Sequence, residues 1–279
     1  MKWVCVGGDK RYAYVVRHAQ NAGFDARGLG FEHARLENVP CAKLSDVGQA
    51  EVVVLPNPFL SGVQLPLARE QLSLETLIGQ IKPGARLMMF GSRKVPQEMD
   101  ERFRITHLSE DEQLMLALAR QTAQGALHAV SGKMDCEWYA CEVLLIGYGR
   151  IGQALHRMLN GYDANVIVAA RRASVREQAK ALGACVIDME AIPEMMEKAR
   201  VVFSTPAQRV LNAGVITHMK KTAMLADLSS SPFGADVASA LAMGIEAWRE
   251  PALPGRFCSE SAGRSVFDAV VRALNNGDE

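Results

Sequence analysis

The sequence lacks several features that would point to whole classes of protein. Its 31 basic and 31 acidic side chains leave no net charge, which argues against a nucleic-acid-binding protein, whose surface usually carries a basic excess. No apolar run reaches the length of about 18 residues that a membrane-spanning helix needs. The apolar segment at the start is too short for a secretory signal peptide. We therefore expect a soluble, cytoplasmic protein that contacts neither nucleic acid nor membrane.

Cysteine patterns that hold metals or disulfides are also missing. The 6 cysteines include no C-x-x-C pair and no histidine partner at the spacing of a zinc site. Three of them, Cys5, Cys141 and Cys185, stand in apolar segments, where a free cysteine is usually a small buried side chain. The spacing thus supports neither a metal site nor a redox role.

What the sequence does have is length and a regular alternation of elements. Its 279 residues correspond to two domains at about 150 residues each, and a hydrophobic fraction of 49% excludes wholesale disorder. Strand-like and helix-like segments alternate along the chain, which favours parallel βαβ units. The predicted strands are Lys2–Gly7, Glu51–Leu55, Arg86–Phe90, Glu142–Ile146, Asn165–Ala169, Cys185–Ile187, Val201–Ser204 and Ala223–Asp227. The predicted helices are Tyr12–Ala22, Leu72–Ile81, Gly149–Leu159, Ser174–Leu182, Ala191–Lys198 and Ser261–Leu274.

Each half of the chain opens with an apolar strand that runs into glycines. We therefore predict an α/β protein of two doubly wound, Rossmann-like domains with a ligand-binding cleft between them. The predicted domains are 1–125, flavodoxin-like or Rossmann-like on the substrate side, and 126–279, which binds the nucleotide. A long helix that begins at a capping box, Ser109 to Glu112, connects them. The last helix packs either on the second domain or back on the first.

A glycine motif in the second half predicts a dinucleotide site. Gly147, Gly149 and Gly152 form a G-x-G-x-x-G that follows a strand and opens a helix, which is the context this motif requires. The three glycines permit a tight turn, close approach of a pyrophosphate, and close packing of helix and strand. Free amides at the helix start, including those of Arg150 and Ile151, would hold the diphosphate.

The end of the next strand discriminates between the two nicotinamide cofactors. An NAD site usually has an acidic residue there to bind the ribose diol. This chain has Arg171, Arg172 and Ser174 instead, which suit a 2′-phosphate because arginine forms charge-assisted, bidentate bonds with it. We predict NADP as the cofactor. Thr205 and Pro206, after a later strand, are expected beside the ribose and nicotinamide.

Several polar segments combine with these motifs into a family pattern. They are Val6-Gly7-Gly8-Asp9-Lys10-Arg11, Thr122–Ala126, the glycine motif with Ala170-Arg171-Arg172, Asp227–Pro232, Pro251–Gly255 and Ser261–Gly263. Together they resemble the A subunit of dipicolinate synthase from spore-forming bacteria, over nearly the whole chain. The glycine motif is shared by many dehydrogenases. The Gly-Gly-Asp start and the Pro-x-Leu-Pro-Gly turn are more particular to this family.

The resemblance implies an NADP-dependent oxidoreductase of sporulation. Such an enzyme oxidises dihydrodipicolinate to dipicolinate by hydride transfer, in the cytoplasm, together with a flavoprotein-like B subunit of the synthase. We also expect a homo-oligomer. Two alternatives stay open. One is an NADP-dependent dehydrogenase of the 2-hydroxy-acid type, and the other is a nucleotide-binding subunit without catalysis of its own.

The resemblance also suggests roles for individual residues toward the dicarboxylate substrate. Asp227 is the candidate proton acceptor or orienting group, with His218 as the alternative base. Gly8 and Asp9 would face the nicotinamide. The side chains expected to bind carboxylates or line the substrate site are Arg11, Arg93, Ser229, Ser231, Ser92, Thr122, Pro254 and Ala262. Three positions depart from the family pattern, because Gln124, Ser231 and Glu260 stand where Glu, Arg and Lys are usual.

Overall fold

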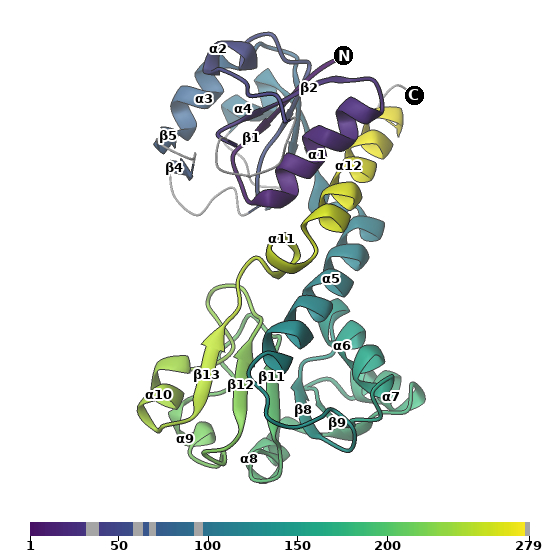
Figure 1. Cartoon of the computed structure of the whole chain (residues 1–279), viewed down its shortest axis with the longest axis vertical. Helices are drawn as coiled ribbons and strands as arrows, with labels where there is room; N and C mark the ends of the chain where they lie inside the picture. Colours follow the sequence, from purple (N-terminus) through teal and green to yellow (C-terminus); the bar gives the residue numbers. More distant parts are fainter. Residues whose placement is uncertain (32–38, 58–63, 67–70, 92–96, 277–279) are drawn as a thin grey trace. The chain divides into compact units, whose positions relative to one another are not determined.

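The structure, a computed structural model, divides into two compact units (Figure 1). The first unit joins Met1–Leu118 to Pro254–Glu279, and the second is Ala119–Leu253. These limits differ from the sequence division at residue 125 because the first boundary falls inside helix α5 (Glu112–Ser131) and the end of the chain returns to the first unit. The residues that the structure describes are 1–31, 39–57, 64–66, 71–91 and 97–276.

The first unit is built on a parallel sheet with the strand order β2-β1-β3-β6-β7. Side chains of β1 alternate between its faces, with Trp3 and Cys5 in one core and Val4 and Val6 in the other. Both faces are apolar, as a sheet covered by helices on both sides requires. The order is that of flavodoxin-like folds. The strands are β1 (Lys2–Val6), β2 (Asp25–Leu29), β3 (Val52–Val54), β6 (Arg86–Met89) and β7 (Arg104–His107).

Helices α1 (Lys10–Asn21) and α12 (Ser259–Asn276) lie side by side in the first unit (Figure 1). Their apolar residues Tyr12, Val266 and Phe267 share one core with the odd-numbered residues of β1. The last helix therefore completes the first unit. Further elements of this unit are α2 (Leu44–Val47), α3 (Leu74–Gln80), α4 (Gln97–Arg102), and the antiparallel pair β4 (Gln64–Pro66) and β5 (Gln71–Ser73).

The second unit contains a parallel sheet with the order β10-β9-β8-β11-β12-β13. Counted from its first strand, this is the 3-2-1-4-5-6 order of dinucleotide-binding domains. The order reverses between β8 and β11, so a ligand is expected at the carboxyl ends of these two strands. The strands are β8 (Glu142–Ile146), β9 (Asn165–Ala169), β10 (Cys185–Ile187), β11 (Val201–Ser204), β12 (Met224–Asp227) and β13 (Glu246–Arg249).

Short helices connect the strands of the second unit. Side chains of α8, α9 and α10 pack in one core with Leu144, Val202 and Leu225 from the centre of the sheet. These helices bury one face of the sheet and leave the carboxyl ends of its strands for loops. The helices are α6 (Arg150–Asn160), α7 (Ala173–Ala181), α8 (Ile192–Met196), α9 (Ala213–Ile216) and α10 (Val237–Ala242). The short turn η2 (Met189–Ala191) also belongs to this unit, whereas η1 (Leu108–Glu110) and most of α11 (Leu253–Phe257) belong to the first unit.

The start of α5 differs from the predicted capping box. Asp111 Oδ1, and not Ser109, accepts the bond from a first-turn amide, that of Leu114, at 2.8 Å. The Ser109 hydroxyl donates to the carbonyl oxygen of Gly91, because the residue lies in the short turn η1 before the helix. The prediction placed the cap two residues too early, since the hydroxyl of Ser109 and the carboxylate of Asp111 are both good N-cap acceptors.

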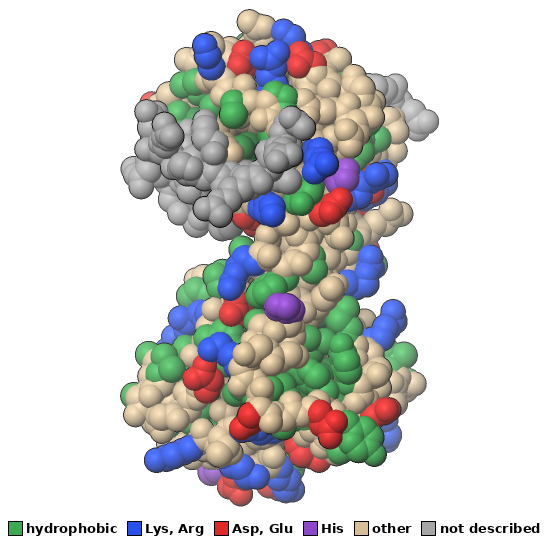
Figure 2. All heavy atoms as spheres, in the orientation of Figure 1, with side chains coloured by type: hydrophobic (Ala, Val, Ile, Leu, Met, Phe, Trp, Pro, Cys, Tyr) green, Lys and Arg blue, Asp and Glu red, His purple; other side chains and the backbone are tan. Residues whose placement is uncertain are grey.

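Charges of both signs are interspersed over the visible face of both units (Figure 2). This matches the balance of 31 basic and 31 acidic side chains. No helix within the described ranges combines the length and the apolar character that crossing a bilayer takes.

Candidate dinucleotide and substrate site

The glycine segment after β8 forms the tight turn that the sequence predicts. Gly147 has a φ of 87°, which is strained for other residues, and a Cβ there would collide with the Thr205 hydroxyl. A Cβ on Gly152 would collide with the carbonyl oxygen of Gly147, so α6 packs closely against the turn. Around Gly149, by contrast, no described atom lies within 4 Å of the Cβ position. This open space fits the close approach of a pyrophosphate to the backbone.

Helix α6 begins directly after this turn. Its N-cap is Gly149, and no side-chain cap bond is formed there within the described chain. The positive end of the helix dipole and the first-turn amides, which include those of Arg150 and Ile151, favour a bound anion. The structure therefore places the five predicted phosphate-binding residues in one turn, and this turn fits a diphosphate.

A buried polar chain supports the glycine turn from behind. The Tyr148 hydroxyl lies 2.8 Å from His156 Nδ1, and His156 Nε2 lies 3.1 Å from the Asn160 side-chain nitrogen. His156 is only 3% exposed, and burial lowers the pKa of its imidazole and raises the pKa of the Tyr148 hydroxyl. The sequence analysis missed this support, although the spacing of His156 and Asn160 on one helix face could have suggested it.

A cavity of about 420 Å³ lies beside the glycine turn. Its lining includes Tyr148, Gly149, Arg171, Arg172, Met189 and Pro206. Arg171 and Arg172 follow β9 directly, and no carboxylate lines this cavity in the described chain. Ser174 is exposed in the first turn of α7, which begins at Ala173. Arg171 and Arg172 therefore meet at one cavity, whereas Ser174 is not part of its lining.

Arg176, which the sequence analysis did not single out, holds this turn in place. Its Nη1 donates to the carbonyl oxygens of Ala170 and Arg171 at 2.8 and 3.0 Å, and its Nη2 lies 3.3 Å from Asp188. These contacts fix the backbone that carries Arg171 and Arg172. A third arginine so close in sequence was available as a signal, but its role depends on the shape of the turn.

Thr205 lies at the topological switch point of the second unit. Its hydroxyl donates to the carbonyl oxygen of Ile146, the last residue of β8, at 2.9 Å. This bond ties the end of β11 to the start of the glycine turn, and Pro206 continues into the cavity wall. The predicted contact of Thr205 with the cofactor ribose stays a prediction.

Asp227, at the end of β12, is a buried carboxylate with both oxygens engaged. Oδ1 accepts from the Ser229 amide at 3.2 Å and from the Ser229 hydroxyl at 2.6 Å, and Oδ2 accepts from the Ala235 amide at 3.2 Å. The Ser229 oxygen in turn accepts from the Gly234 amide at 2.6 Å. We call residues 228–235 the serine loop. Both bonds to Oδ1 and the bond to Oδ2 hold the carboxylate inside the loop, so Asp227 is placed to orient the loop.

Arg249 braces the serine loop from the neighbouring strand, and the sequence analysis missed it. Its Nε lies 3.5 Å from Asp227 Oδ2, and its Nη2 donates to the carbonyl oxygen of Ala235 at 3.1 Å. The guanidinium also stacks over the Phe233 ring at 4.1 Å, where Phe233 has a positive φ of 67°. Ser231 is exposed on the same loop.

The first unit has its own polar turn after β1. Asp9 caps α1 by accepting from the Arg11 amide at 3.0 Å, and it binds the Arg11 side chain through Nε at 3.0 Å and Nη2 at 2.7 Å. Arg11 is 4% exposed. Burial alone lowers the pKa of Arg11, but the hydrogen bonds and charge of Asp9 more than offset this, so the pKa is raised. Arg11 is therefore a buried cation with a built-in partner.

The predicted substrate residues of the C-terminal segment meet the same turn. A Cβ on Gly255 would collide with the Asp9 carboxylate, and Pro254 and Ala262 are buried nearby in the sequence. Gly8, with a φ of 98°, leaves no room for a side chain because Tyr12 would block it. The structure thus brings the Gly-Gly-Asp turn and the Pro-Gly turn together within the first unit.

Other predicted residues lie apart from these turns or outside the described ranges. Thr122 is partly buried on α5 in the second unit, and Gln124 is exposed on the same helix. Glu260 is exposed in the first turn of α12. Ser92 and Arg93 lie outside the described residues. His218 is exposed and pairs with Glu197 at 3.3 Å. Nothing in the described ranges groups three metal-ligating side chains together.

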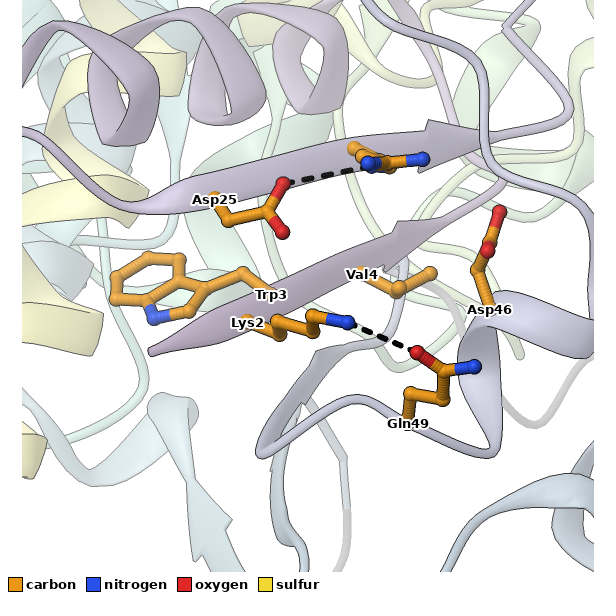
Figure 3. Close-up of a pocket in the computed structure, with 7 residues that line it drawn as sticks. Lys2, Trp3, Val4, Asp25, Asp46 and Gln49 are labelled. Carbon is orange, nitrogen blue, oxygen red and sulfur yellow. Dashed lines mark hydrogen bonds and ion pairs between the residues drawn. The ribbon is translucent and has the colours of Figure 1, made fainter.

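A smaller, polar pocket of about 120 Å³ lies elsewhere in the first unit (Figure 3). It sits at the amino ends of β1 and β2, where Lys2 Nζ donates to the Gln49 side chain at 2.8 Å and Arg27 pairs with Asp25 at 3.4 Å. In open parallel sheets, ligands bind at the opposite, carboxyl ends of the strands. This pocket is therefore set apart from the candidate site by the fold itself.

The sequence matches two protein families in succession. Residues 2–108 match the N-terminal domain of the dipicolinate synthase A subunit, and residues 113–233 match the NAD binding domain of D-isomer specific 2-hydroxyacid dehydrogenase. The second match covers the glycine turn, the cavity and most of the serine loop. The chain therefore carries a nicotinamide-dinucleotide-binding domain after a dipicolinate synthase type of N-terminal domain.

Individual relatives are similar along the whole chain. The A subunit of dipicolinate synthase from Bacillus subtilis is 22% identical over 98% of this chain and 96% of its own. The crystal structure of the corresponding Bacillus halodurans protein has a TM-score of 0.84 at 21% identity, covering 98% of this chain and 97% of that one. A transhydrogenase structure from Sinorhizobium meliloti has a TM-score of 0.70 at 15% identity, covering 98% and 93%. The predicted family resemblance and α/β fold class are confirmed.

Proposed function

We propose that this chain, which resembles the A subunit of dipicolinate synthase over its whole length, oxidises dihydrodipicolinate to dipicolinate with NADP⁺. The resemblance supports the substrate class and the reaction. The observation that carries the cofactor half of the proposal is the pair Arg171 and Arg172 at the cavity beside the glycine turn. Two cations and no lining carboxylate in the described chain suit a 2′-phosphate better than a ribose diol.

The chain's own residues would bind and orient rather than react. The amides of the glycine turn and the start of α6 hold the diphosphate, with Tyr148, His156 and Asn160 keeping the turn in shape. When bound, the nicotinamide supplies the hydride acceptor. Oxidation of the ring releases one hydride and one proton, and the gain of aromaticity lets the proton pass to water without a strong base. Asp227 and Ser229 then serve to hold the serine loop.

The cofactor half of the proposal is tested by comparing NADP⁺ and NAD⁺ affinities in matched variants. We expect the wild-type chain to bind NADP⁺ at least about 10-fold more tightly, since one lost charged contact corresponds to about 1.5–3 kcal/mol. The double variant Arg171→Ala with Arg172→Ala should bring the two affinities together by weakening NADP⁺ alone. Arg157→Ala, on the far end of α6, is the matched control. Equal affinities in the wild-type chain would rule out the NADP assignment.

The reaction is tested by turnover of freshly made dihydrodipicolinate, followed by NADPH formation. We propose that the chain forms a homo-oligomer in the cytoplasm and works there with a flavoprotein-like B subunit of the synthase. The assay is therefore run with and without the purified B subunit. Cofactor binding without turnover in both arms would favour a non-catalytic role for this chain.

A second candidate function follows from the match of residues 113–233 to 2-hydroxyacid dehydrogenases. The same assay with small 2-hydroxy acids tests it. The alternative base that the sequence suggests, His218, is exposed and paired with Glu197, and this does not favour a histidine base in such a reaction. We therefore favour the dicarboxylate.

A further inference from the structure

Arg249 occupies a position that the fold defines closely. It is the last residue of β13 and stands in register with Asp227, the last residue of β12. Side chains in register on neighbouring strands point to the same face and can touch. The 3.5 Å approach of Arg249 Nε to Asp227 Oδ2 is therefore a consequence of strand pairing.

The contacts of Arg249 orient its guanidinium without using all of it. Nε faces Asp227, Nη2 donates to Ala235, and the plane stacks on the Phe233 ring. Within the described chain these contacts use Nε and one side of Nη2, whereas the side chain keeps 37% of its surface exposed. A guanidinium carries five N–H donors in a fixed fork. Arg249 is thus a preoriented cation with donors facing outward.

The strand order shows on which side of the cofactor site Arg249 lies. The diphosphate turn follows β8, and the arginines for the 2′-phosphate follow β9, on one side of β8. A dinucleotide that crosses the sheet at this point extends its other half toward β11 and β12, on the opposite side. Arg249 ends the next strand, β13, so it lies on the nicotinamide side of the glycine turn, the side on which a substrate would bind for hydride transfer.

The charge around Arg249 leaves it suited to an anion. The Asp227 carboxylate is already satisfied by three hydrogen bonds from the serine loop, and the pairing with Arg249 at 3.5 Å is longer than a hydrogen bond. Asp236 is the other nearby carboxylate, and its pKa is lowered first by the Ser239 amide, with Arg209 and Arg249 adding to the effect. Arg209 shares that second charge, at 3.9 Å.

From this geometry we infer that Arg249 binds one carboxylate of the substrate, together with the exposed hydroxyl of Ser231 on the serine loop. The inference rests on the proposed function and assigns a specificity role to a residue outside every motif. Its ligand class is a planar dicarboxylate held at the nicotinamide end. Lysine would not replace it fully, because an ammonium can donate to the Ala235 carbonyl but cannot stack as a plane on Phe233 while it presents a bidentate fork to a carboxylate.

The test compares dipicolinate with picolinate, which has the same ring and only one carboxylate. Affinities of both are measured in the presence of saturating NADP⁺ for the wild-type chain and for Arg249→Met. We expect the wild-type preference for dipicolinate to fall by about 10-fold or more, since the second carboxylate loses a charge-assisted contact. NADP⁺ affinity should stay within about 2-fold, because the diphosphate and 2′-phosphate contacts lie on other strands.

Controls separate this inference from loss of folding and from the proposed function. Arg209→Met removes a cation that is also near Asp236 but 54% exposed, and it should leave the ratio unchanged. An equal fall in both affinities in Arg249→Met means that the residue only shapes the loop, and it overturns the inference. An unchanged ratio overturns it too. If the wild-type chain binds NADP⁺ but neither binds nor forms dipicolinate, the proposed function itself fails.

Discussion

The two units differ in what lies at the amino end of the first helix after their glycine turns. Each has a parallel strand, a glycine turn with positive φ and a helix that starts at the carboxyl edge of its sheet. In the first unit the N-cap is Asp9, whose carboxylate occupies the helix start and is itself bound to Arg11. In the second unit the N-cap is Gly149, and the helix start has open space before it. The N-cap side chain thus decides whether the helix start is occupied by the chain's own carboxylate or is open to a bound anion.

A strand–glycine–helix pattern therefore does not by itself predict a phosphate site. In the first turn the Asp9 carboxylate lies at the positive end of the helix dipole, and Arg11 neutralises that carboxylate. In the second turn the positive end of the dipole has no such side chain, so the negative charge would come from a bound ligand. Substitutions that exchange the two N-cap residues test whether the cap decides anion binding.

The largest effect is expected from Gly149→Asp, which copies the first unit's cap into the second. The new carboxylate would lie at the predicted diphosphate position, where like charges about 4 Å apart repel by about 4 kcal/mol near a protein surface. NADP⁺ affinity, measured by calorimetric titration, should therefore fall on the order of 1000-fold. Thermal unfolding should show equal or slightly higher stability, because a carboxylate N-cap is better than a glycine N-cap by only about a few tenths of a kcal/mol.

Gly149→Ala is the matched control for the carboxylate. It adds a Cβ without charge, in a place with no described atom within 4 Å, so it should cost much less affinity than Gly149→Asp. If the two variants bind NADP⁺ equally well, the helix start is not where the diphosphate lies.

The next largest effect is expected from the reverse change, Asp9→Ala. It removes the cap of α1 and leaves Arg11, 4% exposed, as a buried cation without its partner. Such a loss costs about 3–5 kcal/mol of unfolding free energy. Chemical denaturation measures this, with Asp9→Asn as the control that keeps a cap but not the charge. A loss below about 1 kcal/mol would mean that Arg11 is satisfied by other groups.

The smallest effect is expected from the support behind the second turn. Burial lowers the pKa of His156, so below its ordinary value near 6.5 the unfolded chain takes up a proton more readily than the folded chain. The contribution of neutral His156 to the free energy of unfolding is therefore fully present above that pH and decreases as the pH falls below it. His156→Gln should cost about 1 kcal/mol at pH 7.5 for altered hydrogen bonds and should flatten the pH dependence. An unchanged slope between pH 5 and pH 7.5 would show that another group, such as the similarly shifted His18, dominates it.

The sequence predicted the strands that are apolar runs well and the strands that carry charge poorly. Five strands of the second unit were located within one residue, among them the edge strand β10, because each is a short apolar run. The edge strands β2, with Asp25 and Arg27, and β13, with Glu246 and Arg249, were missed. An edge strand pairs on one side only and tolerates charge, so its sequence need not contain an apolar run.

The missed strand explains the missed site residue. Arg249 acquires a role only when β13 pairs with β12 in register, and nothing near it in sequence indicates that pairing. The glycine turn was predictable because its three glycines meet steric demands within six residues. The engagement of Asp227 with Ser229 and Ala235 was not, since it depends on how the serine loop folds back.

The return of α12 to the first unit has a consequence for synthesis on the ribosome. The core around Trp3 and Tyr12 includes Val266, Phe267 and Val270, residues that are translated after the whole of the second unit. The first unit therefore cannot finish its core until these residues have been synthesised, whereas the second unit is continuous in sequence and needs none of them. The first unit begins to be synthesised earlier, but its core is completed only after the second unit has been synthesised.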